Sequence, residues 1–206
     1  MIGRDDYPSP PLLEDDLDSD PVVQFKKWFN EAHASGIAQP DAMTLATAVD
    51  GQPSARVVLL KHFDESGFVF FSNYQSQKGR EIADNPNVAL CFVWLELHRQ
   101  VRIVGTAARV TSDESDAYFA SRPRGAQIAA SASPQSEILA SRAELESNFA
   151  RIEQETGDPA LRPAHWGGFR VVPATIEFWQ GQPDRLHDRL RYRREAGNWI
   201  IERLAP

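Results

Sequence analysis

From Met43 onward the sequence takes on a period of two, which is the period of a β-strand. Three strands are predicted at 43–49, 54–63 and 68–73, joined by a tight turn at Asp50–Gly51 and another at 64–67. Turns this short join antiparallel neighbours, because a parallel crossover needs a dozen or more residues. The three segments therefore predict an antiparallel meander.

Later segments continue the same pattern, without the regular alternation of strand and crossover helix that a parallel sheet requires. Further strands are predicted at 87–97, 99–110, 169–180, 185–194 and 199–204. Long apolar strands with tight turns favour a closed antiparallel sheet. The predicted fold class is mainly β with flanking helices (α+β), built around an antiparallel barrel.

Helix signals interrupt the strands at a few places. Asp20 before Pro21 is an N-cap followed by proline at the first helical position, and Gly36 ends that helix. Thr111 and Ser141 each begin a capping box, so a helix is expected to follow each of them. Shorter helices are predicted over 76–83 and within 121–134.

The charge is concentrated at the N-terminus. The chain has a net charge of −7, of which residues 1–20 contribute −6, so residues 21–206 are nearly neutral. Residues 1–20 are also proline-rich and offer few side chains to a core, which predicts a flexible acidic leader. Residues 21–206 suit one domain. A nearly neutral body argues against a nucleic-acid partner, which requires a broad basic field.

Cys91 is the only cysteine, so the chain can form no disulfide within itself, which fits a reducing compartment. The N-terminus has no basic segment followed by an apolar run, and the longest apolar stretch, 88–95, is too short to span a bilayer. We therefore expect a cytoplasmic protein with no membrane partner. The five histidines lack the spacing of metal ligands, so no metal site is expected.

A basic stretch near the C-terminus is the strongest indication of a ligand. On a regular strand, one face of this stretch carries Arg185, His187, Arg189, Arg191 and Arg193. Cations in such a row repel one another unless an anion lies against them, so a phosphate-bearing ligand is one interpretation. The alternative is a solvated strand at the edge of the sheet.

Other candidate anion ligands are scattered, and the glycine-rich loops that cradle nucleotides are absent from the sequence. Arg56 and Lys61 bracket one strand, and their odd spacing lets them share a ligand only near a strand end or a bulge. Ser72, Ser76 and Lys78 surround a helix start, and Arg122 and Arg124 follow a helix. Each of these is also a plausible surface residue, and Trp179 is by default a core residue. Neighbouring arginines should lower the pKa of His187 and favour its neutral form.

Five blocks occur together in one order: RVVLLK at 56–61, SRPR at 121–124, WGGFR at 166–170, IEFWQ at 176–180 and RLHDR at 185–189. Together they resemble the pyridoxamine 5'-phosphate oxidase family, and the similarity extends from about Asp20 to Pro206. The resemblance implies a homodimer of split β-barrels with FMN at the subunit interface. It also implies oxidation of pyridoxamine 5'-phosphate or pyridoxine 5'-phosphate to pyridoxal 5'-phosphate in vitamin B6 salvage. Oxygen then reoxidises the flavin and gives hydrogen peroxide, with ammonia released from the amine.

The resemblance also assigns residues. Those that match FMN contacts are Arg56, Val57, Val58, Leu59, Leu60, Lys61, Phe71, Ser72, Gln77, Lys78, Gln100, Gln135, Ser136, Trp179 and Arg189. Those that match substrate contacts are Arg4, Tyr7, Lys61, Tyr118, Arg122, Arg185, Leu186 and His187. Arg4 and Tyr7 belong to an N-terminal Arg-x-x-Tyr that can cover the substrate in the family. Arg185 and His187 are the expected catalytic pair: Arg185 faces the substrate ring opposite the flavin, and His187 orients the reacting group and assists proton removal.

Two positions depart from the family pattern. Gln77 stands where an arginine often precedes the lysine of the FMN-phosphate site, and Ala126 stands where a serine often reaches the substrate phosphate. Each loss removes one contact to a phosphate, which would cost on the order of 1–3 kcal/mol.

Three other functions are compatible with the sequence. One is a related split-barrel flavoprotein that uses another substrate or a deazaflavin, although the RLHDR block argues against it. Another is a protein that binds FMN or pyridoxal 5'-phosphate without turnover. The third is a nucleic-acid binder that uses the basic stretch, which the acidic leader disfavours.

Overall fold

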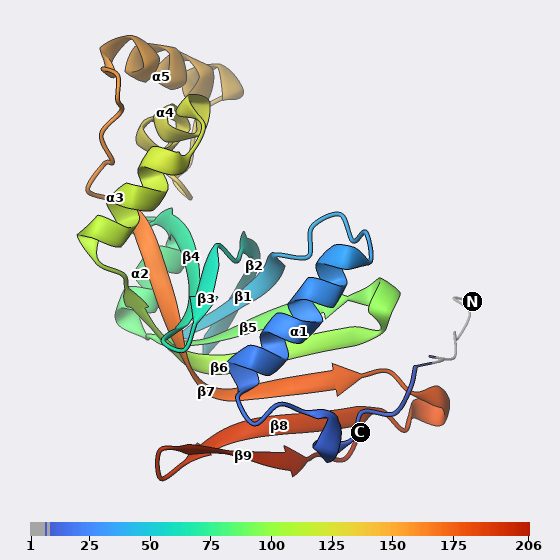
Figure 1. The fold of residues 1–206 in the computed structure, drawn as a ribbon. Helices are drawn as coiled ribbons and strands as arrows, with labels where there is room; N and C mark the ends of the chain where they lie inside the picture. Colours follow the sequence, from blue (N-terminus) through green and yellow to red (C-terminus); the bar gives the residue numbers. More distant parts are fainter. Residues whose placement is uncertain (1–6, 8) are drawn as a thin grey trace.

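The computed structural model describes Tyr7 and residues 9–206. In this part of the chain, nine strands form one antiparallel sheet (Figure 1). They are β1 (Ala42–Val49), β2 (Gln52–Leu59), β3 (His62–Asp64), β4 (Gly67–Asn73), β5 (Asn87–Trp94), β6 (Arg99–Arg109), β7 (Trp166–Gln180), β8 (Asp188–Glu195) and β9 (Asn198–Arg203). The predicted class, antiparallel β with flanking helices, is confirmed.

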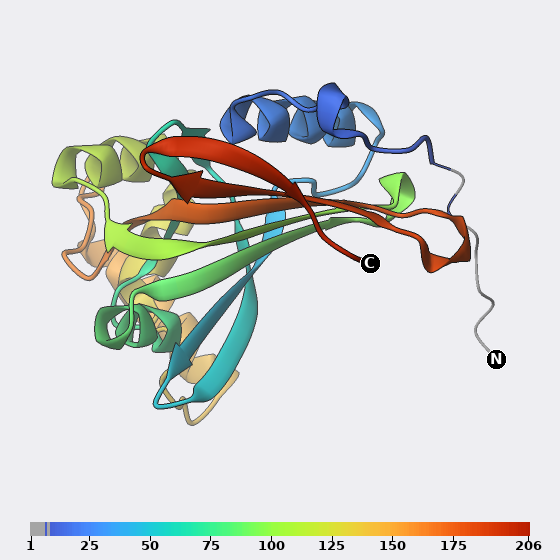
Figure 2. The same ribbon diagram turned by 90° about the horizontal axis from the view of Figure 1, so that it is seen from below.

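The 15-residue strand β7 organises the sheet. One of its edges pairs with β6 along nearly its whole length, and the other edge pairs first with β4 and then with β8. The strand order is β2-β1-β5-β6-β7-β4-β3, and the β8–β9 hairpin branches from β7. Strands β2 and β4 also approach one another, so the first part of the sheet curls toward closure while the hairpin extends away from it (Figures 1 and 2).

The predicted meander is confirmed where 43–49 pairs with 54–59 and where 62–63 pairs with 68–69, but its second strand is not continuous. The segment 54–63 breaks after Leu59, and β4 pairs with β3 and β7 instead of β2. The reason lies in two backbone donors: Leu60 N–H bonds to Asp41 O at 2.9 Å, and Lys61 N–H bonds to Val69 O at 2.8 Å. The chain therefore leaves its partner β1 and joins β4 at this point, which makes Lys61 a residue of the junction.

Two other strand boundaries also differ from those predicted. β5 ends at Trp94, and a 3₁₀ turn η2 (Leu95–Leu97) with His98 in the left-handed conformation (φ 52°) connects it to β6. At the C-terminus, β8 begins at Asp188, so Arg185 and His187 precede it in and after the 3₁₀ turn η3 (Pro183–Arg185). Arg185 has a positive φ of 66°, which no regular strand would allow.

The helices that were predicted from their caps at Asp20, Thr111 and Ser141 begin there. The α-helices are α1 (Pro21–Ala34), α2 (Gln77–Asp84), α3 (Ser112–Ser121), α4 (Arg124–Ala132) and α5 (Arg142–Glu155). The Asp20 carboxylate accepts the Val22 N–H at 2.7 Å, and Thr111 and Glu114 form the predicted reciprocal capping box. α1 lies across the sheet, whereas α3, α4 and α5 extend beyond one end of it (Figure 1). Among the described residues, no helix has the length and apolarity needed to cross a bilayer.

Part of the predicted flexible leader packs on the body. Leu12 is buried, and its N–H donates to the Asp188 carboxylate at 3.0 Å. Arg203 forms an ion pair with Glu14 at 2.8 Å, and the Tyr192 hydroxyl donates to Asp18 O at 2.5 Å. These contacts fix the later leader residues beside the β8–β9 hairpin. The division into a leader and one domain stays a prediction.

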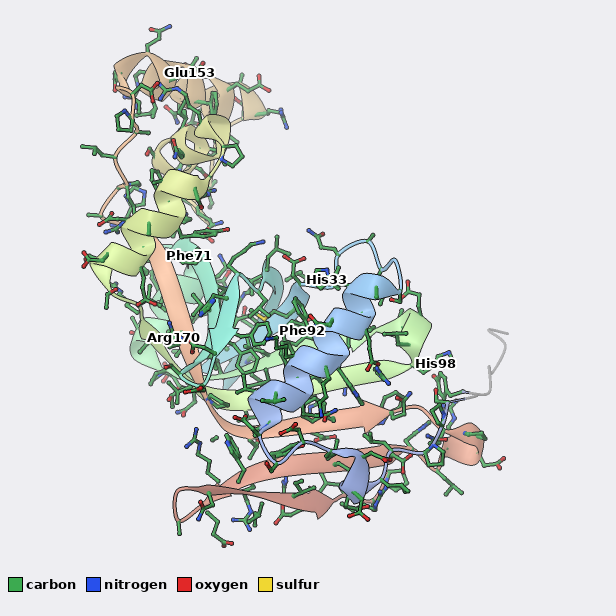
Figure 3. All side chains as sticks on the ribbon, in the orientation of Figure 1. His33, Phe71, Phe92, His98, Glu153 and Arg170 are labelled. Carbon is green, nitrogen blue, oxygen red and sulfur yellow. The ribbon has the colours of Figure 1, made fainter. Side chains whose placement is uncertain are left out.

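The core between α1 and the sheet is largely aromatic. Phe25 is fully buried, and its ring lies 4.9 Å from Phe63, 4.9 Å from Phe68 and 5.1 Å from Phe92, measured between ring centroids. Figure 3 shows Phe92 beneath α1. Edge-to-face packing of this kind adds to the free energy of burial. The helix is thereby attached to strands from both halves of the sheet.

We predict that Phe25→Ala lowers the free energy of unfolding by about 3–5 kcal/mol, because it leaves a cavity among three rings. Chemical denaturation followed by circular dichroism measures the change. Val23→Ala on the exposed side of α1 is the matched control and should cost less than about 1 kcal/mol. Equal effects of the two substitutions would contradict this role for Phe25.

Candidate functional site

A cavity of about 500 Å³ lies against β2, β4, α3 and α4. We call it the main cavity. Ten of the predicted site residues line it: Val57, Val58, Leu59, Lys61, Phe71, Ser72, Lys78, Tyr118, Arg122 and Gln135. The fold therefore brings together residues from three distant parts of the sequence, which belong to both the predicted flavin set and the predicted substrate set.

Arg122 is the least satisfied group in the main cavity. Its guanidinium lies 4.5 Å from the Trp166 ring centroid, and its Nη1 is buried without a hydrogen-bond partner among the described residues. Burial lowers the pKa of Arg122, but an arginine in a protein stays charged. A buried and unpaired cationic N–H is costly unless an anion accepts it. This side of the cavity is therefore suited to an anion.

Aromatic rings form the wall beside Arg122. Phe71 stacks on Tyr118 at a centroid distance of 3.9 Å, and Trp166 continues the stack 5.6 Å from Phe71. The Tyr118 side chain comes from α3, and Phe71 comes from β4. Lys61 also lines the cavity, where its Nζ forms an ion pair with Asp41 at 3.0 Å. Lys61, Tyr118 and Arg122, the predicted substrate-phosphate set, thus lie around one cavity.

Lys78 occupies another part of the same cavity. Its Nζ lies 3.3 Å from the Ser72 hydroxyl, the Ser76 hydroxyl and the Gln135 amide oxygen. Burial lowers the pKa of Lys78, and the positive charge of Arg56 lowers it further. A cation surrounded by neutral hydrogen-bonding groups, with another cation nearby, is suited to a phosphate dianion.

Arg56 does not line the main cavity, because a carboxylate holds it to one side. Its Nη2 lies 2.7 Å from Glu81, and its Nη1 donates to the Thr47 hydroxyl at 2.6 Å. Gln77 donates to the same carboxylate at 2.8 Å and to the Ser54 hydroxyl at 3.3 Å. Glu81 thus offsets the charge of Arg56. Gln77 adds a hydrogen bond to this network but no charge.

A second cavity, of about 200 Å³, lies near the other end of the sheet. It is lined by Tyr7, Val93, Leu95, His98, Arg99, Gln100 and Trp179. Gln100 and Trp179 are opposite one another in the β6–β7 pairing. Trp179 is half-buried at this cavity, so its default assignment to the core is wrong. Figure 3 shows His98 and Phe71, which mark the two cavities, well apart.

His187 lies beside Trp179, with a centroid distance of 4.7 Å. Burial lowers the pKa of His187, Arg185 lowers it further, and Asp188 opposes them. The predicted direction is confirmed, although burial and not like charge is the larger cause. The Gln182 N–H donates to Nδ1 at 3.1 Å, so neutral His187 carries its hydrogen on Nε2. Nε2 is therefore a donor in the neutral form.

The basic face of β8 is balanced by glutamates on the neighbouring strands. Glu177 on β7 lies 2.8 Å from Arg189, and Glu202 on β9 lies 2.6 Å from Arg191 and 3.1 Å from Arg193. β8 pairs with strands on both sides, so the alternative of a solvated edge strand is wrong. Most of the row needs no external anion. Arg185 is exposed, and it lies in the turn before the strand.

Two family models match the chain. One, described as pyridoxamine 5'-phosphate oxidase, matches residues 29–155, and the other, described as the pyridoxine 5'-phosphate oxidase C-terminal dimerisation region, matches residues 166–206. The chain belongs to the pyridoxamine 5'-phosphate oxidase family. The second model covers β7, β8 and β9, the strands that form the branch of the sheet.

Curated members of the family are similar over nearly the whole chain. The pyridoxine/pyridoxamine 5'-phosphate oxidase of Rubrobacter xylanophilus is 57% identical over 98% of this chain and 94% of its own length. The enzyme of the same name from Salinibacter ruber is 53% identical, over 98% of this chain and 97% of its own length.

Solved structures confirm the fold of the family. PhzG from Burkholderia lata 383, in complex with tetrahydrophenazine-1-carboxylic acid, is 33% identical with a TM-score of 0.89, covering 95% of this chain and 98% of that chain. A pyridoxamine 5'-phosphate oxidase-related, FMN-binding protein from Nostoc punctiforme is 18% identical with a TM-score of 0.74, covering 92% and 100%. The latter likeness concerns the fold alone, and the predicted split-barrel fold is confirmed.

The remaining predicted positions lie in varied surroundings. Leu60 belongs to the buried core, Leu186 is exposed, and Ser136 is exposed with a positive φ of 76° after α4. Ala126 lies within α4. Arg4 lies outside the described residues. The roles of all these residues stay predictions.

Sequence reasoning missed several residues of the site. Trp166 lines the main cavity, and its place in the WGGFR block was the available signal. Glu81 and Glu177 hold predicted site arginines, but a glutamate on a helix or strand carries no signal of its partner. His98, at the second cavity, was considered only as a possible metal ligand.

We predict that Glu81→Gln lowers the free energy of unfolding by about 1–2 kcal/mol at pH 7, because Arg56 loses its counter-ion. Burial raises the pKa of Glu81, but hydrogen bonds from Thr47, Gln77 and Arg56 outweigh it and hold the pKa below its usual value. The contribution is therefore complete above the unfolded-state pKa and disappears as pH falls through the lower folded-state pKa. Denaturation curves measured from pH 7 down to pH 3 should converge for the two proteins.

Glu153→Gln on the exposed surface of α5 is the matched control (Figure 3). It should leave the free energy of unfolding within about 0.5 kcal/mol at every pH. A constant difference between wild type and Glu81→Gln down to pH 3 would contradict the ionic role of Glu81.

Proposed function

We propose that this chain is an FMN-dependent oxidase that converts pyridoxamine 5'-phosphate and pyridoxine 5'-phosphate to pyridoxal 5'-phosphate. Oxygen accepts the electrons and gives hydrogen peroxide, and the amine substrate releases ammonia. The unpaired, buried Nη1 of Arg122 carries the proposal, because it lies at a cavity that also contains Lys61, Tyr118 and Lys78. Two phosphorylated ligands require two sets of cationic groups. In this cavity, Lys61 and Arg122 form one set and Lys78 belongs to the other.

The described residues fit FMN. Lys78, Ser72 and Gln135 would hold its phosphate, since all three cluster within hydrogen-bonding distance of one another. Arg56 would add to the positive potential without leaving its ion pair with Glu81. When bound, the flavin supplies the hydride acceptor, and the protein supplies binding, orientation and electrostatics.

A second copy of the chain completes the proposed site. The match to a dimerisation region over residues 166–206 indicates a homodimer. Val57 at the main cavity and Leu95 at the second are 66% and 73% exposed, more than apolar residues beside a finished binding site should be. In our proposal, the main cavity of one protomer meets the second cavity of the other. Gln100, Trp179 and Arg189 of the partner subunit would then help to hold FMN.

In this arrangement the substrate phosphate binds Lys61, Tyr118 and Arg122, and Arg185 packs against the pyridine ring. His187 orients the reacting substituent. Its neutral form offers an Nε2–H, because Nδ1 already accepts the Gln182 N–H. His187 can therefore donate a hydrogen bond from Nε2 to the substrate oxygen or nitrogen. The role expected from the sequence was that of a proton acceptor, which this geometry does not favour. We therefore assign His187 the orienting role alone.

The structural similarity to PhzG supports a second candidate, an oxidase of the same fold that acts on another substrate. That protein is 33% identical to this chain, whereas the curated oxidases above are 53–57% identical. The cations of the main cavity favour a phosphorylated substrate. A non-catalytic FMN carrier would share the cavity but would release no peroxide.

The deciding experiment is an aerobic assay of the purified protein. We expect bound flavin absorbance, and formation of pyridoxal 5'-phosphate with one peroxide for each pyridoxamine 5'-phosphate consumed. Pyridoxamine without its phosphate should react at least about a hundredfold less efficiently, since it leaves Arg122 unpaired. A colourless protein that gains no activity on addition of FMN would overturn the proposal. Equal catalytic efficiency with pyridoxamine and pyridoxamine 5'-phosphate would contradict the binding of a substrate phosphate at Arg122.

We further predict that Arg185→Ala and His187→Ala each retain bound FMN and lose at least about a hundredfold in kcat/KM. Both residues contact the substrate in the proposal, whereas the flavin phosphate lies elsewhere. Arg191→Ala is the matched control, because Arg191 is paired with Glu202 and has no assigned ligand. Flavin absorbance and steady-state rates measure both quantities. Loss of FMN from either alanine variant would contradict the division of roles.

A further inference from the structure

The N-terminal segment reaches the second cavity through Tyr7. The Tyr7 ring centroid lies 4.9 Å from that of His98, 5.7 Å from that of His187 and 6.0 Å from that of Trp179. The approach is close: a Cβ added at Gly181 would lie 2.7 Å from Tyr7 Cγ. Tyr7 therefore packs directly on two residues of the proposed site, and His98 is its closest aromatic neighbour.

His98 is suited to hold this segment because its own backbone is fixed. It adopts a left-handed conformation at the end of η2, and its carbonyl accepts the Gly181 N–H at 2.8 Å and a Gln180 amide hydrogen at 3.2 Å. These bonds join the turn before β6 to the end of β7. Figure 3 shows His98 at that end of the sheet.

The side chain of His98 meets the segment at two points. One is the Tyr7 ring, and the other is Ser9, whose hydroxyl lies 3.4 Å from Nδ1. Farther along, the Pro10 carbonyl accepts from the Gln182 side chain at 2.9 Å and the Leu12 N–H donates to Asp188. The segment from Pro10 is thus attached to the turn and hairpin after β7. Tyr7 and Ser9, which precede it, lie against His98.

We propose that His98 is a positioning residue: it holds Tyr7 against Trp179 and His187 and thereby keeps the vitamin side of the site covered. His98 acts through Tyr7 and does not itself contact the substrate. The expected effect on kinetics rests on the proposed function. The contact between His98 and Tyr7 does not depend on that function. An aromatic pair of this kind contributes enough to change an apparent affinity about fivefold.

The test compares His98→Asn with wild type as FMN-loaded protein. Asparagine tolerates the left-handed backbone, so the turn is kept while the ring is lost. We expect KM for pyridoxine 5'-phosphate to rise about fivefold, with kcat within twofold and FMN affinity unchanged. In a Tyr7→Ala background, His98→Asn should change KM no further, because the two residues act as one unit. His33→Asn, on the exposed end of α1, is the matched control.

A spectroscopic readout makes the inference independent of turnover. The chain contains four tyrosines, so 3-fluorotyrosine labelling gives few ¹⁹F signals, and Tyr7→Phe identifies that of Tyr7. We expect this signal to move toward the position of the free amino acid in His98→Asn and to stay in place in His33→Asn. An unmoved signal, or an equal KM effect in both Tyr7 backgrounds, would overturn the role of His98. A protein without oxidase activity whose Tyr7 signal still moves would overturn the proposed function and support the contact.

Discussion

The pairing of β7 is the constraint on which the rest of the structure depends. One edge of this strand follows β6, while the other must serve both β4 and β8. The change of partner falls near Pro173, which has no N–H to give to a ladder. Across from it, the register shifts between Val104 and Gly105, and a Cβ at Gly105 would lie 2.1 Å from Val172 O. Pro173 and Gly105 thus lie at the place where the sheet divides into a barrel and a hairpin, which we call the fork.

The fork also divides the chemistry. On the barrel side, β4 presents Phe71 and Ser72 to the main cavity, and α3 and α4 close over it. On the hairpin side, Trp179, His187 and Arg189 gather at the end of β7 and the start of β8. Neither side alone contains the full predicted residue set. The proposed dimer would bring the two predicted sets together around one cofactor, and the match to a dimerisation region supports a dimer independently.

Local signals were enough for much of the fold. The N-caps at Asp20, Thr111 and Ser141 were readable because a cap involves residues close in sequence. The break after Leu59 was not, since it depends on Asp41 and Val69, which the local pattern cannot identify as partners. The start of β8 was misjudged for a similar reason. The alternation of basic residues with other residues extends back to Arg185. The backbone at Arg185 nevertheless forms a turn with a positive φ, which the alternation cannot reveal.

The site shows the same division between local and distant information. Motif resemblance assigned Lys61, Tyr118 and Arg122 to one task, and they line one cavity. The counter-ions were invisible, because Glu81, Glu177 and Glu202 reach their arginines across strands and helices.

These counter-ions change the meaning of the basic stretch. A row of arginines suggested an external anion, yet Glu177 and Glu202 already satisfy most of it within the sheet. Among the described residues, the buried cationic N–H without a hydrogen-bond partner belongs to Arg122, and its only signal in the sequence was the weak one of a second arginine, Arg124, two positions later. A count of cations along one strand therefore overstates the need for an anionic ligand, because glutamates on the neighbouring strands can pair with those cations. Burial without a partner is the more discriminating sign of a binding site, and it requires the folded chain to be seen.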